Sequence, residues 1–135
     1  MITGINHITL SVSDLDRAFV FYTQVLGCQP VARWRRGAYL LAGDLWLCLY
    51  LDWQVRKGAL PEYTHIALSV AEHDFQKIER QISDVATIWQ QNSSEGRSLY
   101  FLDPDGHKLE VHTGDLNTRI ETVKAQPYEE MEFFL

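Results

Sequence analysis

The sequence predicts an α+β domain in which two β-α-β-β-β modules form a curved mixed sheet. The first observation is a repeat, because residues 64–70 (THIALSV) resemble residues 6–12 (NHITLSV). The second is that each copy precedes a segment of helical periodicity and then three short strand-like segments. The third is a length of 135 residues with 46% hydrophobic side chains, which suits one globular core. We therefore expect residues 1–135 to form a single domain.

The first module spans residues 1–51 and opens with alternating residues at 5–12, which predict a strand. Ser13 and Asp16 then have the spacing of a capping box at the start of a helix. Gly27 is expected to end that helix. Three further strands are predicted at about 30–35, 38–42 and 45–51.

The linker between the modules is predicted at residues 52–62, which lack periodicity and contain glycine and proline. The second module, residues 63–113, repeats the order of the first. Its helix is marked by apolar residues at helical spacing, namely Phe75, Ile78 and Ile82. A strand near 86–90, a polar loop at 91–97 and a hairpin at 98–112 are predicted to follow.

The hairpin is predicted to turn at residues 103–106 (DPDG), because proline presets the second position of a type I turn and glycine suits the last. The tail, residues 114–135, is expected to contain a short helix at about 116–123. Its apolar end at 131–135 is expected to pack on the domain or on a partner.

Composition excludes several classes of protein. The formal net charge of −6 argues against nucleic-acid binding, which favours a basic surface. No apolar segment approaches the length of a membrane span, and Met1 leads directly into a strand pattern rather than a signal peptide. Cys28 and Cys48 lack the spacing of a thiolate zinc site or a disulfide framework. We therefore expect a cytoplasmic protein.

Polar and aromatic side chains collect on the strand faces that point away from the helices. They are His7, Thr9, Tyr39, Trp46, Cys48, His65, Ser98, Tyr100 and Glu110. Two such sheets can curve into a shared trough with the composition of a small-molecule site. His7 and His65 hold equivalent positions in the repeat, so we expect the pseudo-symmetry to bring them together with Glu110. Two imidazoles and a carboxylate suit a catalytic Mn²⁺, Fe²⁺ or Zn²⁺ with open coordination positions.

Each of these residues also has an ordinary structural interpretation. A single strand histidine is more often a hydrogen-bonded polar residue than a ligand, and the repeat does not extend to His73, His107 or His112. Cys48 is expected to be packed rather than nucleophilic. The loop at 91–98 is a solvated loop, an oxygen cage for a cation, or an anion-binding turn. Arg119 is either a surface charge or an anchor for an anion.

Several segments of the chain also carry a resemblance to a known family. They are GINHITLSVSDL, GAYLLAGDLWLCL, YTH, NSSEGRSLYFLDPDGHKLEVHTGDL and QPYEEM. Over nearly its whole length the chain resembles the FosA-type fosfomycin-resistance glutathione transferases of the vicinal-oxygen-chelate superfamily. The resemblance implies a domain-swapped homodimer. It also implies Mn²⁺, or another divalent metal, held by His7 of one chain and by His65 and Glu110 of the other.

The same resemblance implies further contacts. A K⁺ ion is implied at Asn92, Ser94, Gly96, Ser98 and Tyr100. Substrate contacts are implied at Thr9, Gln90, Ser94, Tyr100 and Arg119, of which Thr9, Tyr100 and Arg119 are the catalytic candidates. Tyr39 and Trp46 are further expected substrate contacts, as walls of the pocket, because they lie on the polar strand face. The family usually has lysine where this chain has Gln90, and a basic residue where it has Ser93. We expect weaker phosphonate binding, because a charge-assisted contact contributes about 1.5–3 kcal/mol.

The activity that the resemblance implies is the metal-dependent addition of glutathione to the epoxide of fosfomycin. An enzyme with other chemistry on the same scaffold is the first alternative: epoxide hydration, glyoxalase-like isomerisation of a glutathione hemithioacetal, or Fe²⁺-dependent ring cleavage. Hydration needs a carboxylate base, and the acidic candidate Asp44 is better explained as a turn residue. The second alternative is a non-catalytic protein that sequesters the drug. Three metal ligands argue against it. Neither nucleic acid nor membrane is an expected partner.

Overall fold

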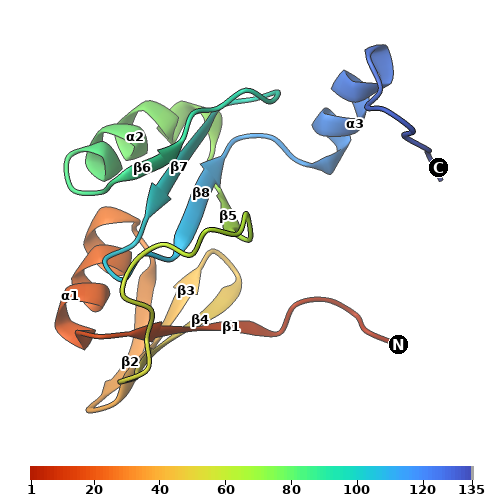
Figure 1. The fold of residues 1–135 in the computed structure, drawn as a ribbon. Coiled ribbons are helices and arrows are strands. Elements are labelled where there is room, and N and C mark those ends of the chain that lie inside the picture. Colours follow the sequence, from red (N-terminus) through yellow and green to blue (C-terminus); the bar gives the residue numbers. More distant parts are fainter. Residues whose placement is uncertain (135) are drawn as a thin grey trace.

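The computed structural model describes residues 1–134, which form two four-stranded mixed sheets, one from each half of the chain (Figure 1). The strand order is β1-β4-β3-β2 in the first sheet and β5-β8-β7-β6 in the second. In each sheet the first strand of the module pairs in parallel with the last strand, and the other pairs are antiparallel. The two halves therefore share one topology, and the predicted α+β fold of paired modules is confirmed.

The elements of the first half follow the order expected from the sequence. They are β1 (His7–Val12), α1 (Leu15–Val20), the π-helix η1 (Phe21–Val25), β2 (Gln29–Trp34), β3 (Gly37–Ala42) and β4 (Leu45–Leu51). The π-helical turn contains Thr23, whose hydroxyl donates to the carbonyl of Phe19 at 2.7 Å and so competes with the regular helical pattern. Gly27 ends the helix as predicted, because its φ of 77° lies in the left-handed region that glycine adopts freely.

The start of α1 differs from the prediction. Asp14 is the N-cap, and its carboxylate accepts the backbone N–H three residues further on at 3.0 Å. The predicted Ser13–Asp16 capping pair is wrong because both side chains have other partners. The Ser13 hydroxyl donates to Asp105 at 2.6 Å, and Asp16 pairs with Arg33 across to β2.

The elements of the second half repeat the first and add a C-terminal helix. They are β5 (Ile66–Ser69), the short 3₁₀-helix η2 (Glu72–Asp74), α2 (Phe75–Ser83), β6 (Ile88–Gln90), β7 (Ser98–Leu102), β8 (Lys108–His112) and α3 (Leu116–Ala125). The predicted hairpin is confirmed, and its turn closes where the Gly106 amide donates to the Asp103 carbonyl at 3.0 Å. A reciprocal capping box between Asp115 and Thr118 starts α3, which continues two residues beyond the predicted end.

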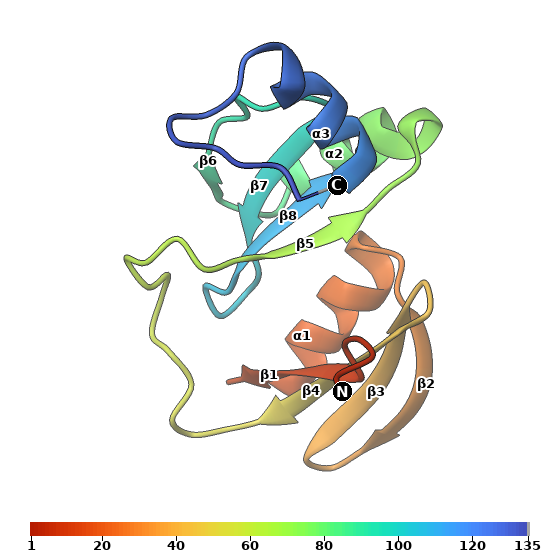
Figure 2. The same ribbon diagram turned by 90° about the vertical axis from the view of Figure 1, so that its right-hand side faces the viewer.

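Both modules contribute to one hydrophobic core. Its largest fully buried side chains come from both halves: Tyr22, Phe75, Phe101, Leu40, Leu49, Ile82, Leu109 and Val12. Helix α1 packs on β3 and β4, and η1 contacts α2. In Figure 2, α1 lies between the first sheet and β5. The modules are thus joined through their helical sides, which leaves the opposite sheet faces available for a site.

The hairpin turn of the second module is bonded to the first module. Three of its side chains reach across the boundary: Asp105 accepts from the Ser13 hydroxyl at 2.6 Å, Asp103 accepts from the Tyr22 hydroxyl at 2.7 Å, and His107 Nε2 donates to the Ser11 carbonyl at 2.7 Å. Burial raises the pKa of Tyr22 well above its ordinary value, and the Asp103 carboxylate adds to the shift. Gly106 has a φ of 91°, and a Cβ there would lie 2.5 Å from the carbonyl carbon of Gly58 in the linker.

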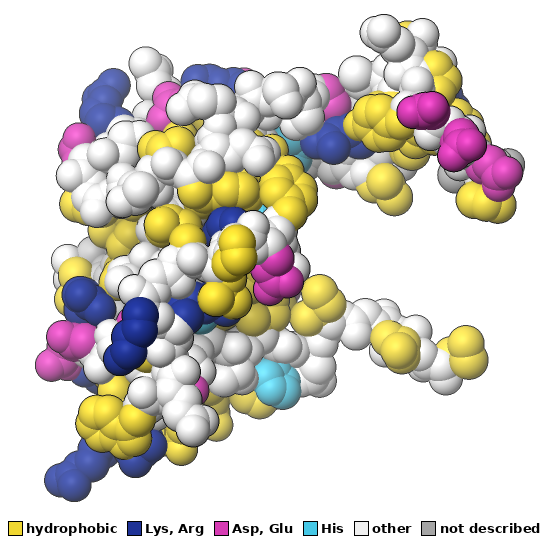
Figure 3. All heavy atoms as spheres, in the orientation of Figure 1, with side chains coloured by type: hydrophobic (Ala, Val, Ile, Leu, Met, Phe, Trp, Pro, Cys, Tyr) yellow, Lys and Arg dark blue, Asp and Glu magenta, His cyan; other side chains and the backbone are white. Residues whose placement is uncertain are grey.

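The two ends of the chain project from one side of the molecule (Figure 1). Figure 3 shows this side hollowed between them, with hydrophobic side chains on both projections. Ile2 is 95% exposed and Phe134 is 90% exposed, so Phe134 is not covered by the rest of its own chain. Leu135, the last residue of the predicted apolar end, lies outside the described residues. No helix in the described part of the chain is both long and apolar enough to cross a membrane.

Candidate functional site

Glu110 is a buried carboxylate whose two oxygens both have partners. It lies on β8 opposite Tyr100 of β7 and is only 6% exposed. Its Oε2 accepts a hydrogen bond from the Ser98 hydroxyl at 2.6 Å, and its Oε1 lies 3.1 Å from His65 Nε2. The parallel pairing of β5 with β8 brings the start of β5 beside Glu110. Two of the three predicted metal ligands therefore meet.

The hydrogen bonds of His65 leave a place for a cation. Its Nδ1 lies 2.8 Å from the carbonyl oxygen of Tyr63, so Nδ1 carries a proton and donates it. Nε2 then faces the Glu110 carboxylate, and only a proton or a metal ion between these two atoms makes the contact favourable. Two ligand atoms that lie about 2.1 Å from one metal ion, at about a right angle, are about 3.0 Å apart. The observed 3.1 Å fits two adjacent positions on one ion.

His7, the third predicted ligand, lies on β1 in the first sheet. Its ring packs on Trp46 with 4.3 Å between ring centroids, and its Nδ1 bonds to Asn6 Oδ1 at 2.7 Å. Within residues 1–134, no three His, Cys, Asp or Glu side chains are close enough together to hold a metal ion. The expectation that the repeat brings His7 to the His65–Glu110 pair is therefore not met inside one chain. The two sheets are separate, and their modules are joined through helices.

Aromatic rings surround His65 on the second sheet. Tyr63, Trp89 and Tyr100 approach its ring edge-on, with centroid distances of 4.8, 5.5 and 6.0 Å. Gln90 donates its amide N–H to the Tyr63 hydroxyl at 3.1 Å. The sequence analysis did not select Tyr63 or Trp89. The YTH segment held a clue for the first, since alternation in an extended segment leading into β5 puts Tyr63, two residues before His65, on the same side.

A second polar group extends from Glu110 through Ser98. The one hydroxyl proton of Ser98 is donated to Glu110, so His112 Nδ1 must donate to the Ser98 oxygen across 2.6 Å. His112 Nε2 then lies 3.5 Å from Glu95 Oε1, which also accepts Arg119 Nε at 2.9 Å. The bond to Glu95 is the largest cause of the raised pKa of Arg119. The result is one continuous network.

Sequence reasoning treated His112 as an ordinary histidine and did not consider Glu95. The position of His112 two residues after Glu110, on the same strand face, was the available indication. Glu95 gave no such indication, because it lies in an irregular loop. Of the other two histidines, His107 is buried between the modules and His73 is exposed.

The loop predicted as an oxygen cage closes on itself. Asn92 Oδ1 accepts the Ser94 amide and hydroxyl at 3.1 and 3.0 Å, and Asn92 Nδ2 donates to the Gly96 carbonyl at 3.0 Å. A Cβ on Gly96 would lie 3.0 Å from His112 Cε1, and the φ of Gly96 is 76°, so glycine is required here. Arg119 also donates to the Ser94 hydroxyl at 3.3 Å. The loop is thus fixed to the network around Glu110.

The first sheet presents a separate aromatic face. Tyr39 packs edge-on against both Trp34 and Trp46, at centroid distances of 4.7 and 5.3 Å. Thr9 pairs in register with Cys48 on the neighbouring strand. Cys48 is buried as expected, and burial raises its pKa against the opposing bond from Thr9, so the thiol stays protonated at neutral pH. Thr9, Tyr39 and Trp46 are therefore on the first sheet, whereas the other predicted substrate contacts are on the second module and α3.

The fold and this arrangement of donors define a class of protein. A family model described as the Glyoxalase/Bleomycin resistance protein/Dioxygenase superfamily matches residues 4–111. The chain therefore belongs to that superfamily, and within it to the family of the glutathione transferase FosA. It is 47% identical to glutathione transferase FosA of Serratia marcescens, over 98% of this chain and 96% of that one. It is 34% identical to metallothiol transferase FosB of Lysinibacillus sphaericus, over 98% and 97% of the two chains.

Solved structures of fosfomycin-resistance proteins share the fold. FosX from Mesorhizobium loti is 32% identical with a TM-score of 0.75, covering 89% of this chain and 99% of that one. A mutant of FosX from Listeria monocytogenes, solved with Mn(II) and 1S,2S-dihydroxypropylphosphonic acid, is 26% identical. Its TM-score is 0.78, with 90% of this chain and 99% of that one covered.

Proposed function

We propose that this chain adds glutathione to fosfomycin and so opens the epoxide of the antibiotic. The observation that carries the proposal is the His65–Glu110 pair, whose facing nitrogen and oxygen atoms can bind a cation. The chain that holds this pair is 47% identical to a glutathione transferase FosA. In the reaction the glutathione sulfur bonds to an epoxide carbon and the bond from that carbon to oxygen breaks. The thiol proton ends on the new hydroxyl group.

The proposed metal ion is held by His65 and Glu110 of one chain and His7 of a second copy. The pair supplies two adjacent ligand atoms 3.1 Å apart. The bond from His7 Nδ1 to Asn6 fixes the ring and leaves Nε2 for a metal. Mn²⁺ is the first choice, because a FosX relative was solved with Mn(II). A bound divalent ion supplies a Lewis acid for the negative charge that develops on the epoxide oxygen.

A second copy is part of the same proposal. The two projecting ends of the chain are not covered by the rest of that chain, since Ile2 and Phe134 are 95% and 90% exposed. A homodimer with exchanged modules would cover these apolar ends and would bring Thr9, Tyr39 and Trp46 of one chain opposite the second sheet of the other. The substrate site would then lie between the two chains.

The remaining roles belong to substrate binding. Arg119 uses Nε and Nη2 for Glu95 and Ser94, which leaves guanidinium N–H groups for a phosphonate oxygen. Tyr100 and Thr9 are proposed to hydrogen-bond the substrate near the reacting oxygen. No protein nucleophile is needed because the thiol comes from glutathione. This agrees with Cys28, where burial raises the pKa to about 11, and with the raised pKa of Cys48.

A potassium ion in the loop is proposed to assist phosphonate binding. Its oxygen atoms would come from Asn92, Ser94, Gly96, Ser98 and Tyr100. The closed loop supports this, because Asn92 Oδ1, the Ser94 hydroxyl and the Gly96 carbonyl already lie within one hydrogen-bonded turn. Uncharged oxygens of this kind are ligands for hard cations.

Hydration of the epoxide is the second candidate. It is favoured by one observation, that a structurally similar FosX holds a dihydroxy phosphonate. The acidic residue weighed for it, Asp44, lies in the exposed turn between β3 and β4 of the first sheet. Nothing in the described residues places Asp44 near the His65–Glu110 pair.

Mass spectrometry distinguishes the two reactions. The protein is incubated with Mn²⁺, K⁺ and fosfomycin, with and without glutathione. Glutathione transfer predicts the thiol adduct and no turnover without thiol, whereas hydration predicts a diol in both samples. Absence of any adduct from a sample with bound metal would refute the proposal. His65→Ala, which removes a proposed metal ligand, is expected to abolish the adduct, and His73→Ala, which alters an exposed histidine, is its matched control.

A further inference from the structure

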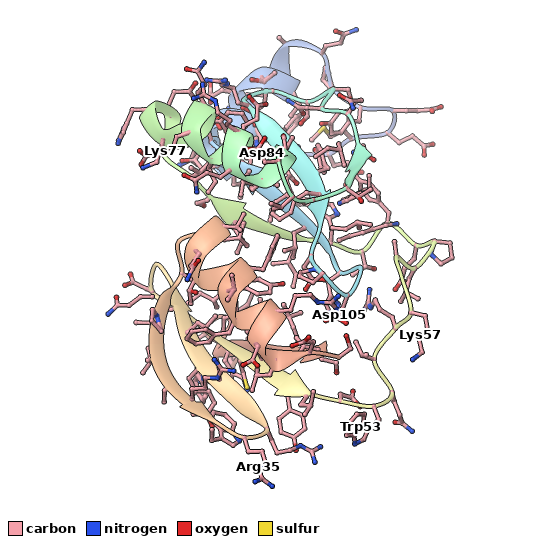
Figure 4. The ribbon with its side chains drawn as sticks, turned by 90° about the vertical axis from the view of Figure 1, so that its left-hand side faces the viewer. Arg35, Trp53, Lys57, Lys77, Asp84 and Asp105 are labelled. Carbon is pink, nitrogen blue, oxygen red and sulfur yellow. The ribbon has the colours of Figure 1, made fainter. Side chains whose placement is uncertain are left out.

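A hollow in the described part of the chain lies away from the His65–Glu110 pair, since neither residue lines it. It is a groove of about 730 Å³, which is within the range of small-molecule sites. Four segments line it: α1 with η1, linker residues 55–59, residues 85–87 and the hairpin turn at 102–106. Figure 4 shows Asp105 of the turn between α1 and the linker segment that carries Lys57. The site proposed above uses none of the residues that line this groove.

The walls of the groove are largely aliphatic and partly open to water. Val20 on α1 is 46% exposed and Val85 is 63% exposed, and both face the same hollow. Phe21 and Val55 also line the groove and are buried, at 7% exposure each. An apolar ligand body would remove the two valines from water, which is favourable in proportion to the area covered.

The floor of the groove is fixed before any ligand arrives. The backbone of Gly106 packs so closely on Gly58 that an added Cβ would lie 2.5 Å from its carbonyl carbon. Asp105 is held by the Ser13 amide at 3.1 Å and by the Ser13 hydroxyl at 2.6 Å. The linker, which has no regular secondary structure here, therefore packs directly on the turn, and Asp105 bonds that turn to the first module.

The charges around the groove favour an anion. The lining contains three cations, Arg17, Arg56 and Lys57, and two carboxylates, Asp103 and Asp105. Both carboxylates are buried and hydrogen-bonded, and Arg17 lies 3.7 Å from Asp105. Arg56 and Lys57 make no ion pair with any residue in the range 1–134. In a chain of net charge −6, two uncompensated cations beside an apolar hollow form a complementary surface for a negative group.

We propose that this groove binds a small amphipathic anion. The apolar body of the ligand lies against Val20 and Val85, and its anionic group meets Arg56 and Lys57. Because Val20 belongs to the first module and Val85 to the second, the bound ligand contacts both modules at once. Ligand binding therefore stabilises their association and raises the melting temperature of the protein.

The test uses the fluorescent anion 8-anilinonaphthalene-1-sulfonate, which has an apolar ring system and one sulfonate. The double variant Arg56→Ala/Lys57→Ala is expected to bind it about tenfold more weakly than the unaltered chain, as for the loss of a charge-assisted contact. The matched control Arg35→Ala/Lys77→Ala removes the same charge at positions outside the groove (Figure 4) and is expected to bind within about twofold of the unaltered chain. Equal affinities for the two double variants would overturn the proposal.

Amide chemical shifts show where the probe binds. On titration, the shifts are expected to change at residues 55–59, 85–87 and 102–106, and to stay constant in the loop at 91–97. Val85→Trp, which fills the groove from an exposed position, is expected to abolish these changes while the melting temperature without probe is retained. Shift changes confined to the two projecting chain ends, or to the aromatic face of the first sheet, would contradict binding of the probe in the groove. Glutathione transfer is measured separately, so its failure leaves this test intact.

Discussion

Replacing Gln90 with lysine is expected to strengthen the binding of fosfomycin. Gln90 is half-buried at the end of β6, pairs in register with Tyr100, and donates to the Tyr63 hydroxyl beside His65. A lysine at this position would place an ammonium group next to the proposed phosphonate site. It would supply the charge that the FosA-type resemblance leads us to expect and that this chain lacks.

The size of the effect follows from the contacts exchanged. A charge-assisted hydrogen bond to the phosphonate contributes about 1.5–3 kcal/mol. The lost bond from Gln90 to Tyr63, 3.1 Å long and open to solvent, contributes about 0.5–1 kcal/mol. The difference of about 1–2 kcal/mol corresponds to about a 5- to 30-fold lower dissociation constant for fosfomycin.

The measurement is calorimetric titration with fosfomycin at fixed Mn²⁺ and K⁺, together with kcat/KM for glutathione transfer. Gln91→Lys is the matched control, because it adds the same charge at an exposed neighbouring position. The gain in Gln90→Lys should shrink as ionic strength rises. An unchanged dissociation constant in Gln90→Lys, or an equal gain in Gln91→Lys, would refute the assignment of this position to the phosphonate.

Three further predictions concern the metal pair and the core. His65→Ala is expected to weaken Mn²⁺ binding at least about 100-fold by calorimetry, since the loss of an outer partner alone costs about 10- to 100-fold. Tyr22→Phe is expected to lower the free energy of unfolding in urea by about 1–3 kcal/mol, because the buried Asp103 loses its hydroxyl donor. The free energy of unfolding is also expected to fall by about 2 kcal/mol between pH 9 and 11, because the Cys28 thiol ionises near pKa 9 when unfolded and near about 11 when folded.

Each of these predictions has a control in the same chain. His73→Ala alters an exposed histidine and should leave Mn²⁺ affinity unchanged; equal affinities for His65→Ala and the unaltered protein would remove His65 from the site. Tyr50→Phe alters a hydroxyl on a 42% exposed ring and should change stability little. Cys28→Ala should flatten the decline above pH 9, and an undiminished slope in that variant would assign the decline to other groups.

The fold was predictable because its determinants are periodic and local. Alternating strands, a helix at 75–82 and a turn at 103–106 each follow from residues close together in the chain. The π-helical turn and the N-cap at Asp14 were not predictable from the sequence, because they depend on which hydrogen-bond partners the side chains of Thr23 and Ser13 have in the folded chain. Thr23 bonds to its own helix, and Ser13 bonds to Asp105, 92 residues away.

The candidate site was predictable only in part, because some of its contacts join residues that no local pattern connects. Alternation predicts that His65 and Glu110 point to the same side of the second sheet. The parallel pairing of β5 with β8 then brings the two side chains together. His7 depends on how whole modules are arranged, which no local pattern encodes. Glu95 depends on the course of an irregular loop, so its contact with Arg119 had no periodic signature.

The turn at 103–107 makes the two halves of this duplicated chain non-interchangeable. Its three side chains bond to residues 81 to 96 positions earlier, whereas the corresponding turn of the first module, at Gly43-Asp44, carries no such set. Exchanging the two turns would therefore remove all three bonds between the modules, whereas exchanging strands within a module would leave them in place.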